Sequence, residues 1–174
     1  MLIFVYGGSG SGKSAFAESL LTRRSEGHRA YIATMEPYGE EGARRIARHR
    51  ALRAGKGFTT YECQRGLETL VLPAGSAALL EDLTNLFANE WFGGERAGAA
   101  DRVLAGLDRL GERCSLAVVV GNDVFADGVG YDEETEAYLR ALAGVNRAVA
   151  ARAHEIWEVV CGLPLRQAPD YRPR

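Results

Sequence analysis

Residues 7–14 read Gly7-Gly8-Ser9-Gly10-Ser11-Gly12-Lys13-Ser14 and fit the pattern G-x-x-x-x-G-K-[ST] of a phosphate-binding loop. The stretch follows the apolar run 2–6 and opens the run 13–24, in which apolar residues recur at helical spacing. Glycines let backbone N–H groups turn inward around a phosphate chain, because they adopt positive φ and carry no Cβ. The alternative is a glycine-rich turn without a ligand, but the strand before and the helix after favour nucleotide binding.

Three side chains are expected to act on the bound phosphates. Lys13 would reach the β- and γ-phosphates, and the Ser14 hydroxyl would hold Mg²⁺. Such a site also needs an acid at the end of a buried strand, and Glu81 and Asp82 directly follow the apolar run 77–80. Asp82 could instead cap a helix that starts at residue 83. We therefore favour Glu81 as the acid on the Mg²⁺ side, with Asp82 as the second candidate.

Short apolar runs alternate with helical stretches along the whole chain, which predicts an α/β fold of the P-loop NTPase type. The sheet is expected to be mostly parallel with helices on both faces. Expected strands cover 2–6, 31–33, 58–61 (near a sheet edge), 77–80, 116–120 and 156–161. Expected helices cover 13–24, 40–53, 83–92, 97–113 and 132–153. We expect one nucleotide-binding domain, 1–166, and a C-terminal tail, 167–174.

Composition excludes several classes of protein. The 174 residues carry 21 Lys and Arg against 23 Asp and Glu, a net charge of -2, which argues against nucleic acid as a partner. Apolar runs are too short for a membrane span and no signal peptide is evident, so we expect a cytoplasmic protein. Cys63, Cys114 and Cys161 lack the spacing of a zinc site or a disulfide framework. We expect all three to be buried as small hydrophobic residues.

A basic segment carries the most reactive histidine candidate. On a helix, Arg45, His49 and Arg53 are four residues apart and share one face. Neighbouring cations would keep the His49 imidazole neutral, and a neutral imidazole can attack phosphorus. On these residues alone, a solvated basic face is the more common outcome. His28 and His154 are weaker candidates, in a polar turn and at a helix end.

The combined motifs resemble the bifunctional adenosylcobinamide kinase/adenosylcobinamide-phosphate guanylyltransferase family of cobalamin biosynthesis. The resemblance spans nearly the whole chain. It rests on residues 5–14, 31–34, 45–50, 79–84 with Asn89, 119–124, 145–146 and 156–165. This chain departs from the family pattern at 123–131, where the proline is missing and Phe125 is bulky. That loop is expected to shape the corrinoid side of the site.

The resemblance implies roles for residues that spacing alone does not assign. His49 would take up GMP as a covalent intermediate, with Lys13 as the second catalytic residue. Arginines 45, 48, 50 and 53 would neutralise the triphosphate. Together, the phosphate-loop motif and the resemblance predict these nucleotide-binding residues: Gly7, Gly8, Ser9, Gly10, Ser11, Gly12, Lys13, Ser14, Ala33, Thr34, Arg50, Glu62 and Glu81. The loop motif and the acid pair after residue 80 predict Ser14, Glu81 and Asp82 as metal-binding residues.

The resemblance also implies two reactions and a set of partners. ATP or GTP would phosphorylate adenosylcobinamide with Mg²⁺, and GMP from GTP would then be transferred to give adenosylcobinamide-GDP. Related enzymes form homotrimers, so we expect a homo-oligomer. Two alternatives remain: a single-activity small-molecule P-loop kinase of the shikimate or gluconate type, and a non-catalytic nucleotide-binding regulator.

Overall fold

Strands and helices alternate along the chain, as the sequence predicts. The computed structural model describes residues 1–37, 39, 44, 47, 55–125 and 128–167. Its strands are β1 (Leu2–Gly7), β2 (Arg29–Ala33), β3 (Phe58–Glu62), β4 (Ala77–Glu81), β5 (Leu116–Asn122), β6 (Glu155–Val160) and β7 (Leu163–Gln167). Its α-helices are α1 (Lys13–Arg24), α3 (Leu83–Gly93), α4 (Ala99–Arg113) and α5 (Glu133–Arg152). The α/β class is confirmed.

The strands form one sheet in the order β3-β2-β4-β5-β1-β6-β7. All neighbours pair in parallel except β6 and β7, which form an antiparallel hairpin. β3 lies at one edge, as predicted. β7 was not predicted, and Gln167, which we assigned to the tail, belongs to it. Pro164 hid the strand signal, since proline is tolerated in a sheet only at an edge such as this one.

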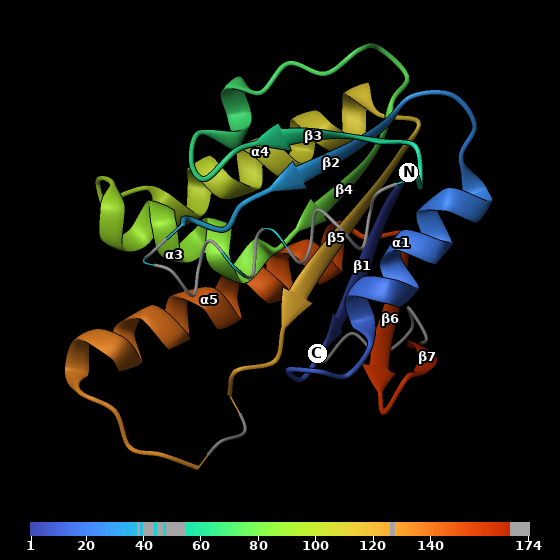
Figure 1. The fold of residues 1–174 in the computed structure, drawn as a ribbon. Coiled ribbons are helices and arrows are strands. Elements are labelled where there is room, and N and C mark those ends of the chain that lie inside the picture. The colour runs from blue at the N-terminus through green and yellow to red at the C-terminus, as the bar shows by residue number, and fades with distance from the viewer. Residues whose placement is uncertain (38, 40–43, 45–46, 48–54, 126–127, 168–174) are drawn as a thin grey trace.

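Helices cover both faces of the sheet, because β1 sends alternate side chains to opposite sides. Leu2 and Phe4 join the hydrophobic cluster that includes residues of α3, α4 and α5. Ile3 and Val5 join the cluster beneath α1. Figure 1 shows α1 on one face and α3, α4 and α5 on the opposite face. Among the described helices, none is long and apolar enough to cross a membrane.

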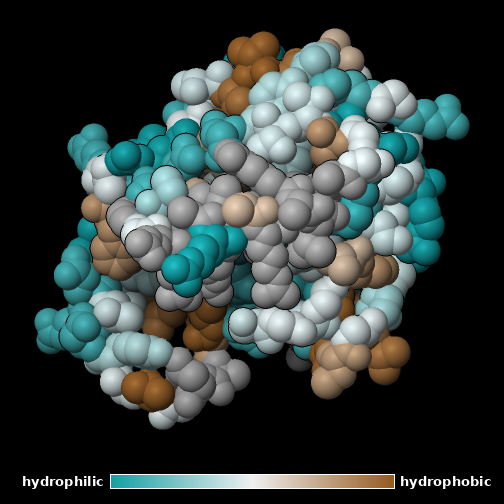
Figure 2. Space-filling view, viewed as in Figure 1, coloured by the Kyte–Doolittle hydropathy of each residue, from teal (hydrophilic) through white to brown (hydrophobic). Residues whose placement is uncertain are grey.

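The β6–β7 hairpin departs from the predicted burial pattern. Cys63 and Cys114 are buried as expected, but Cys161 is exposed at the hairpin turn, and none of the three forms a disulfide. Leu163 and Leu165 are also exposed, at 67% and 50%. Hydrophobic colour is visible over this hairpin at the lower right of the space-filling view (Figure 2). An edge strand explains the error, because its outer side has no covering layer.

Candidate active site

The loop between β1 and α1 has the geometry of a phosphate-binding turn. Gly10 and Gly12 adopt left-handed φ angles of 71° and 91°, which side chains rarely tolerate. A Cβ on Gly7 would lie 2.5 Å from the Val159 carbonyl oxygen. The Gly162 N–H donates to the Ser11 carbonyl at 2.8 Å, which joins the loop to the β6–β7 turn. Contacts with the β6–β7 hairpin thus fix the conformation of the phosphate-binding loop.

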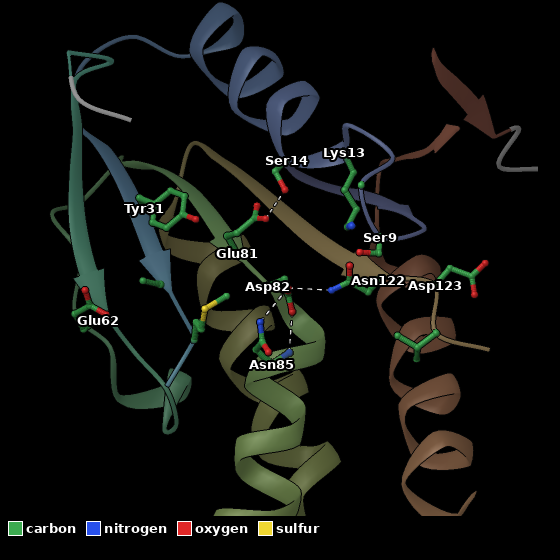
Figure 3. A pocket seen from close by; sticks show the side chains of 14 residues that line it. Ser9, Lys13, Ser14, Tyr31, Glu62, Glu81, Asp82, Asn85, Asn122 and Asp123 are labelled. Carbon is green, nitrogen blue, oxygen red and sulfur yellow. Dashed lines mark hydrogen bonds between the residues drawn. The ribbon is translucent and has the colours of Figure 1, made fainter. Parts of the chain in front are cut away.

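Lys13 lies folded along this loop. Its Nζ donates to the Gly8 carbonyl at 3.1 Å, and the residue is only 7% exposed. A buried ammonium group needs acceptors close by, and phosphate oxygens would supply stronger ones than a single carbonyl. Lys13 also lines the cavity described below (Figure 3).

Glu81 ends β4 opposite the first residues of α1. The Ser14 hydroxyl donates to Glu81 Oε1 at 2.5 Å, and Glu81 Oε2 is buried and has no hydrogen-bond partner among the residues that the structure describes. Burial is the largest cause of the raised pKa of Glu81, about 7, although Ser14 and Lys13 act in the opposite direction. A hydroxyl beside a carboxylate with a free oxygen is a donor set that suits Mg²⁺. The geometry therefore favours Glu81 on the metal side.

Asp82 is the N-cap of α3, the alternative that its position had suggested. Its Oδ1 accepts from the Asn85 N–H at 2.7 Å. Its Oδ2 accepts from Asn122 Nδ2 at 2.9 Å and from Asn85 Nδ2 at 3.1 Å (Figure 3). Burial raises the pKa of Asp82, while the bonds from Asn85 and Asn122 oppose the shift. Asp82 faces the cavity with both oxygens already used.

Thr34 is completely buried and does not line the cavity. Its hydroxyl donates to the Asp82 carbonyl at 2.8 Å and accepts from the Asp82 N–H at 2.7 Å. Asn89 Nδ2 donates to the Thr34 carbonyl at 2.8 Å and to the Gln64 carbonyl at 3.0 Å. In this geometry the Thr34 side chain does not reach the cavity where we expected it to contact the nucleotide. Thr34 instead holds the carboxyl end of β4 in position.

A cavity of about 400 Å³ lies across the carboxyl ends of the strands. We call it the nucleotide cavity. It is lined by Ser9, Gly10, Lys13, Ser14, Tyr31, Ala33, Met35, Glu62, Glu81, Asp82, Asn85, Asn122, Asp123 and Val124. Figure 3 shows Glu62 and Tyr31 at one end and Asp123 at the other, with Lys13, Ser14 and Glu81 between them. Four residues of the predicted phosphate-binding loop thus line the same cavity as the predicted Ala33 and Glu62.

The basic segment falls largely outside the described residues. Arg44 and Ala47 are helical, whereas His49, Arg50 and the arginines 45, 48 and 53 are not described. The other two histidines have structural partners. His154 Nδ1 accepts from the Leu2 N–H at 3.1 Å, and His28 Nδ1 lies 2.9 Å from the Ser76 hydroxyl. Neither lines the nucleotide cavity. The role of His49 thus remains a prediction.

Sequence reasoning assigned no role to several residues that line the cavity. Asn122 and Asp123 lie at and just after the end of β5, as Glu81 ends β4. Polar residues directly after an apolar run collect at the carboxyl edge of a parallel sheet, where ligands bind. Asn122 and Asp123 follow an apolar run, so the sequence could have indicated their place at this edge. Asn85 does not follow such a run, since it reaches Asp82 from the first turn of α3.

Comparison with known proteins agrees with this geometry. Residues 3–167 match the family described as cobinamide kinase / cobinamide phosphate guanyltransferase. The bifunctional adenosylcobalamin biosynthesis protein CobU of Salmonella typhimurium is 34% identical over 182 aligned residues, covering 95% of this chain and 99% of that protein. The protein of the same name from Escherichia coli is 31% identical over 95% of this chain and 99% of its own.

Two further proteins are similar at greater distance. The bifunctional adenosylcobalamin biosynthesis protein CobP of Pseudomonas aeruginosa is 30% identical, covering 92% of this chain and 94% of that protein. Among solved structures, the flagellar accessory protein FlaH of Methanocaldococcus jannaschii has a TM-score of 0.46 at 10% identity. That comparison covers 90% of this chain and 70% of that chain.

Proposed function

The chain belongs to the cobinamide kinase / cobinamide phosphate guanyltransferase family, and we propose that it performs both of the transfers named there. It would phosphorylate adenosylcobinamide with ATP or GTP and then transfer GMP from GTP to the phosphate just formed. The observation that carries this proposal is the convergence of Lys13, Ser14 and Glu81 in the middle part of the nucleotide cavity. Family membership supplies the identity of the acceptor.

In the first reaction, the acceptor hydroxyl oxygen bonds to the γ-phosphorus and the bond to the β-phosphate oxygen breaks. Negative charge spreads over the transferring group and the departing nucleoside diphosphate. Lys13 lies where it can exchange its bond to the Gly8 carbonyl for bonds to these oxygens. The loop N–H groups and the N-terminus of α1 add fixed partial positive charge.

Mg²⁺ fits the residues that the structure brings together. Ser14 and Glu81 would hold it, because Glu81 Oε2 is a buried oxygen with no partner in the described part of the chain. Asp82 would act from behind Glu81, since Asn85 and Asn122 occupy its oxygens. When bound, the ion would neutralise charge on the bridging phosphate oxygens.

In the second reaction, an imidazole nitrogen of His49 bonds to the α-phosphorus of GTP and pyrophosphate leaves. The phosphate of the acceptor then displaces the imidazole and takes the GMP. A covalent intermediate replaces one difficult displacement with two easier ones. Arg45, Arg48, Arg50 and Arg53 would neutralise the triphosphate as it reacts. Glu62 and Ala33, at the far end of the nucleotide cavity, would contact the nucleoside.

Intact mass spectrometry after incubation with GTP and Mg²⁺ tests the second reaction directly. The parent protein should gain the mass of one GMP moiety, and His49→Ala should gain none. His28→Ala is the matched control and should keep the adduct, because His28 pairs with Ser76 outside the nucleotide cavity. An unlabelled parent, or a labelled His49→Ala variant, contradicts the guanylyltransferase assignment.

Adding adenosylcobinamide to the same incubation distinguishes the two alternative functions. A single-activity small-molecule kinase would transfer only the γ-phosphoryl group to its acceptor and would form no GMP adduct. A nucleotide-binding regulator would bind GTP with Mg²⁺ but release neither pyrophosphate nor a phosphorylated acceptor. Product analysis of one reaction mixture therefore separates all three functions.

We also propose that the protein works as a homo-oligomer, with a trimer as the expected form, and that it acts in the cytoplasm. Support for self-association comes from the exposed apolar residues Leu163 and Leu165 on the edge strand β7. Exposed apolar edge strands tend to pair with another chain. Sedimentation velocity would give the mass of the assembly, and a monomer at micromolar concentration would contradict this proposal.

A further inference from the structure

A second cavity of about 460 Å³ lies beside the nucleotide cavity, between α5 and the carboxyl half of β1. We call it the α5 cavity. Its walls are largely apolar: Phe4 and Tyr6 stack with ring centroids 5.7 Å apart, and Ile156 of β6 lies next to them in the sheet. Phe125, from the loop after β5, also lines it. A cavity of this kind binds a ligand mainly by contact with apolar surface.

Small residues create the space. Ala143, Asn146, Arg147 and Ala150 line the cavity and follow the spacing i, i+3, i+4, i+7, so they share one face of α5. The two alanines leave room at both ends of this face. On the opposite wall, a Cβ at Gly121 would lie 2.8 Å from the Phe4 ring. Glycine at this position therefore lets the Phe4 ring lie against β5.

Two polar groups on this face have no partner among the described residues. Asn146 Oδ1 is buried and accepts no hydrogen bond. A buried acceptor without a donor is unfavourable. A ligand N–H that donated to the Asn146 amide oxygen, after rotation of the amide toward the cavity, would therefore be stabilising. The exposed Arg147 has no acid within ion-pairing distance in the part of the chain that the structure describes. The face thus offers one acceptor and one set of donors.

The two cavities share a wall. Asn122 and Asp123 line both of them. Asn122 bonds to Asp82 in the nucleotide cavity, and the Asp123 N–H donates to the Gly7 carbonyl at the start of the phosphate-binding loop at 3.0 Å. A molecule in the α5 cavity would therefore need only to pass Asn122 to reach the end of the phosphate chain.

We propose that the α5 cavity is the acceptor subsite, in which Asn146 accepts a carboxamide N–H of cobinamide and Arg147 donates to a carboxamide oxygen. This inference rests on the proposed function for the identity of the acceptor. Cobinamide carries carboxamide side chains around an apolar macrocycle, which matches the apolar rings and the two unpartnered polar groups. An edge of the macrocycle occupies the cavity, and the reacting hydroxyl extends past Asn122 toward the nucleotide.

The test compares cobinamide binding with nucleotide reactivity in three variants. Asn146→Leu removes the acceptor, Arg147→Gln removes the charge, and Ala143→Leu fills the cavity. Equilibrium dialysis with cobinamide should give a dissociation constant raised about tenfold in each, because the first two variants lose a directional contact and the third loses space. The dissociation constant for GTP and the extent of GMP labelling should stay at the parent values, because both are measured without the acceptor.

Ala151→Leu is the matched control, since Ala151 is exposed on the same helix and does not line the cavity. It should bind cobinamide as the parent does. Arg147 is also exposed, so Arg147→Gln tests the inference even if a buried substitution unfolds the protein. Unchanged cobinamide binding in Arg147→Gln and Ala143→Leu would overturn the inference.

The outcome is independent of the second reaction. If the parent forms no GMP adduct, the guanylyltransferase assignment fails while dialysis still locates the acceptor. If the adduct forms and the three variants bind cobinamide normally, the assignment stands and the α5 cavity is not the acceptor subsite.

Discussion

The nucleotide cavity and the α5 cavity lie side by side but are built on opposite principles. In the first, buried acids lie among hydrogen-bond donors, and both oxygens of Asp82 are bonded. In the second, stacked rings and alanines line the cavity together with Asn146, whose amide oxygen has no donor among the described residues. Charged phosphates need dipoles fixed in advance, whereas a large neutral acceptor needs room and few directional contacts. Asn122 lines both cavities and lies at the boundary between them.

The largest effect is expected for Lys13→Ala, which should impair the nucleotide cavity and leave the α5 cavity unchanged. Lys13→Ala should lower kcat/KM for phosphorylation by about 10²–10³-fold, the usual cost of one lost electrostatic donor at a reacting group. Cobinamide binding without nucleotide should not change. The control is Lys56→Ala, which removes the only other lysine, an exposed partner of Glu18, and should leave both quantities intact. Steady-state kinetics and dialysis measure them. Reduced cobinamide binding in Lys13→Ala would show that the two cavities are not separate sites.

The same contrast explains what the sequence could predict. Residues 7–14 form the loop from one continuous stretch, and Glu81 follows a visible apolar run, so local patterns predicted both. The bonds of Thr34 to the Asp82 peptide were not predicted, because they join positions 48 residues apart. The α5 cavity takes residues from four strands, a loop and a helix, and Phe4 and Asn146 meet only after folding. No local pattern marks such a site.

The next effect concerns the backbone of the phosphate-binding loop. Gly7→Ala would place a Cβ 2.5 Å from the Val159 carbonyl oxygen and 2.8 Å from Ser11 Oγ. We expect a loss of about 3 kcal/mol in the free energy of unfolding, the upper range for overpacking. Gly8→Ala is the control, because nothing lies within 4 Å of its Cβ. Urea denaturation measures both, and equal midpoints for the two variants would contradict the close approach.

Thr34 tests whether hydrogen bonding stabilises the nucleotide side. Thr34→Val keeps the shape but leaves the Asp82 N–H and carbonyl without the hydroxyl that serves both. The expected loss is about 2 kcal/mol in the free energy of unfolding, the cost of stranding buried polar groups. Thr34→Ser retains the hydroxyl and should recover most of it. If the valine and serine variants are destabilised equally, Thr34 contributes to stability through packing rather than through hydrogen bonding.

Glu81 gives the nucleotide side a pH dependence. Its pKa is raised from 4.5 to about 7, chiefly by burial. This shift contributes stability fully below pH 4.5, and the contribution is lost as the pH rises through about 7. Mg²⁺ and nucleotide favour the carboxylate, so their affinity should increase about tenfold between about pH 6 and 8. Calorimetric titration measures it, with Glu81→Gln as the reference for titration of the nucleotide itself. A parent slope equal to that of the variant would show that Glu81 does not titrate in this range.

The smallest expected effect belongs to the α5 cavity. Asn146→Leu removes a buried oxygen that has no donor among the described residues, so no hydrogen bond is lost. The free energy of unfolding should therefore stay within about 0.5 kcal/mol of the parent or increase, since stranded acceptors are unfavourable. Thermal denaturation without ligand measures this, with Thr34→Val as the contrasting case. A loss as large as that of Thr34→Val would mean that Asn146 stabilises the fold, and its unpaired oxygen would no longer indicate a ligand. A stable variant that binds cobinamide weakly would instead show that Asn146 contributes to cobinamide binding and not to the stability of the fold, in contrast to Thr34.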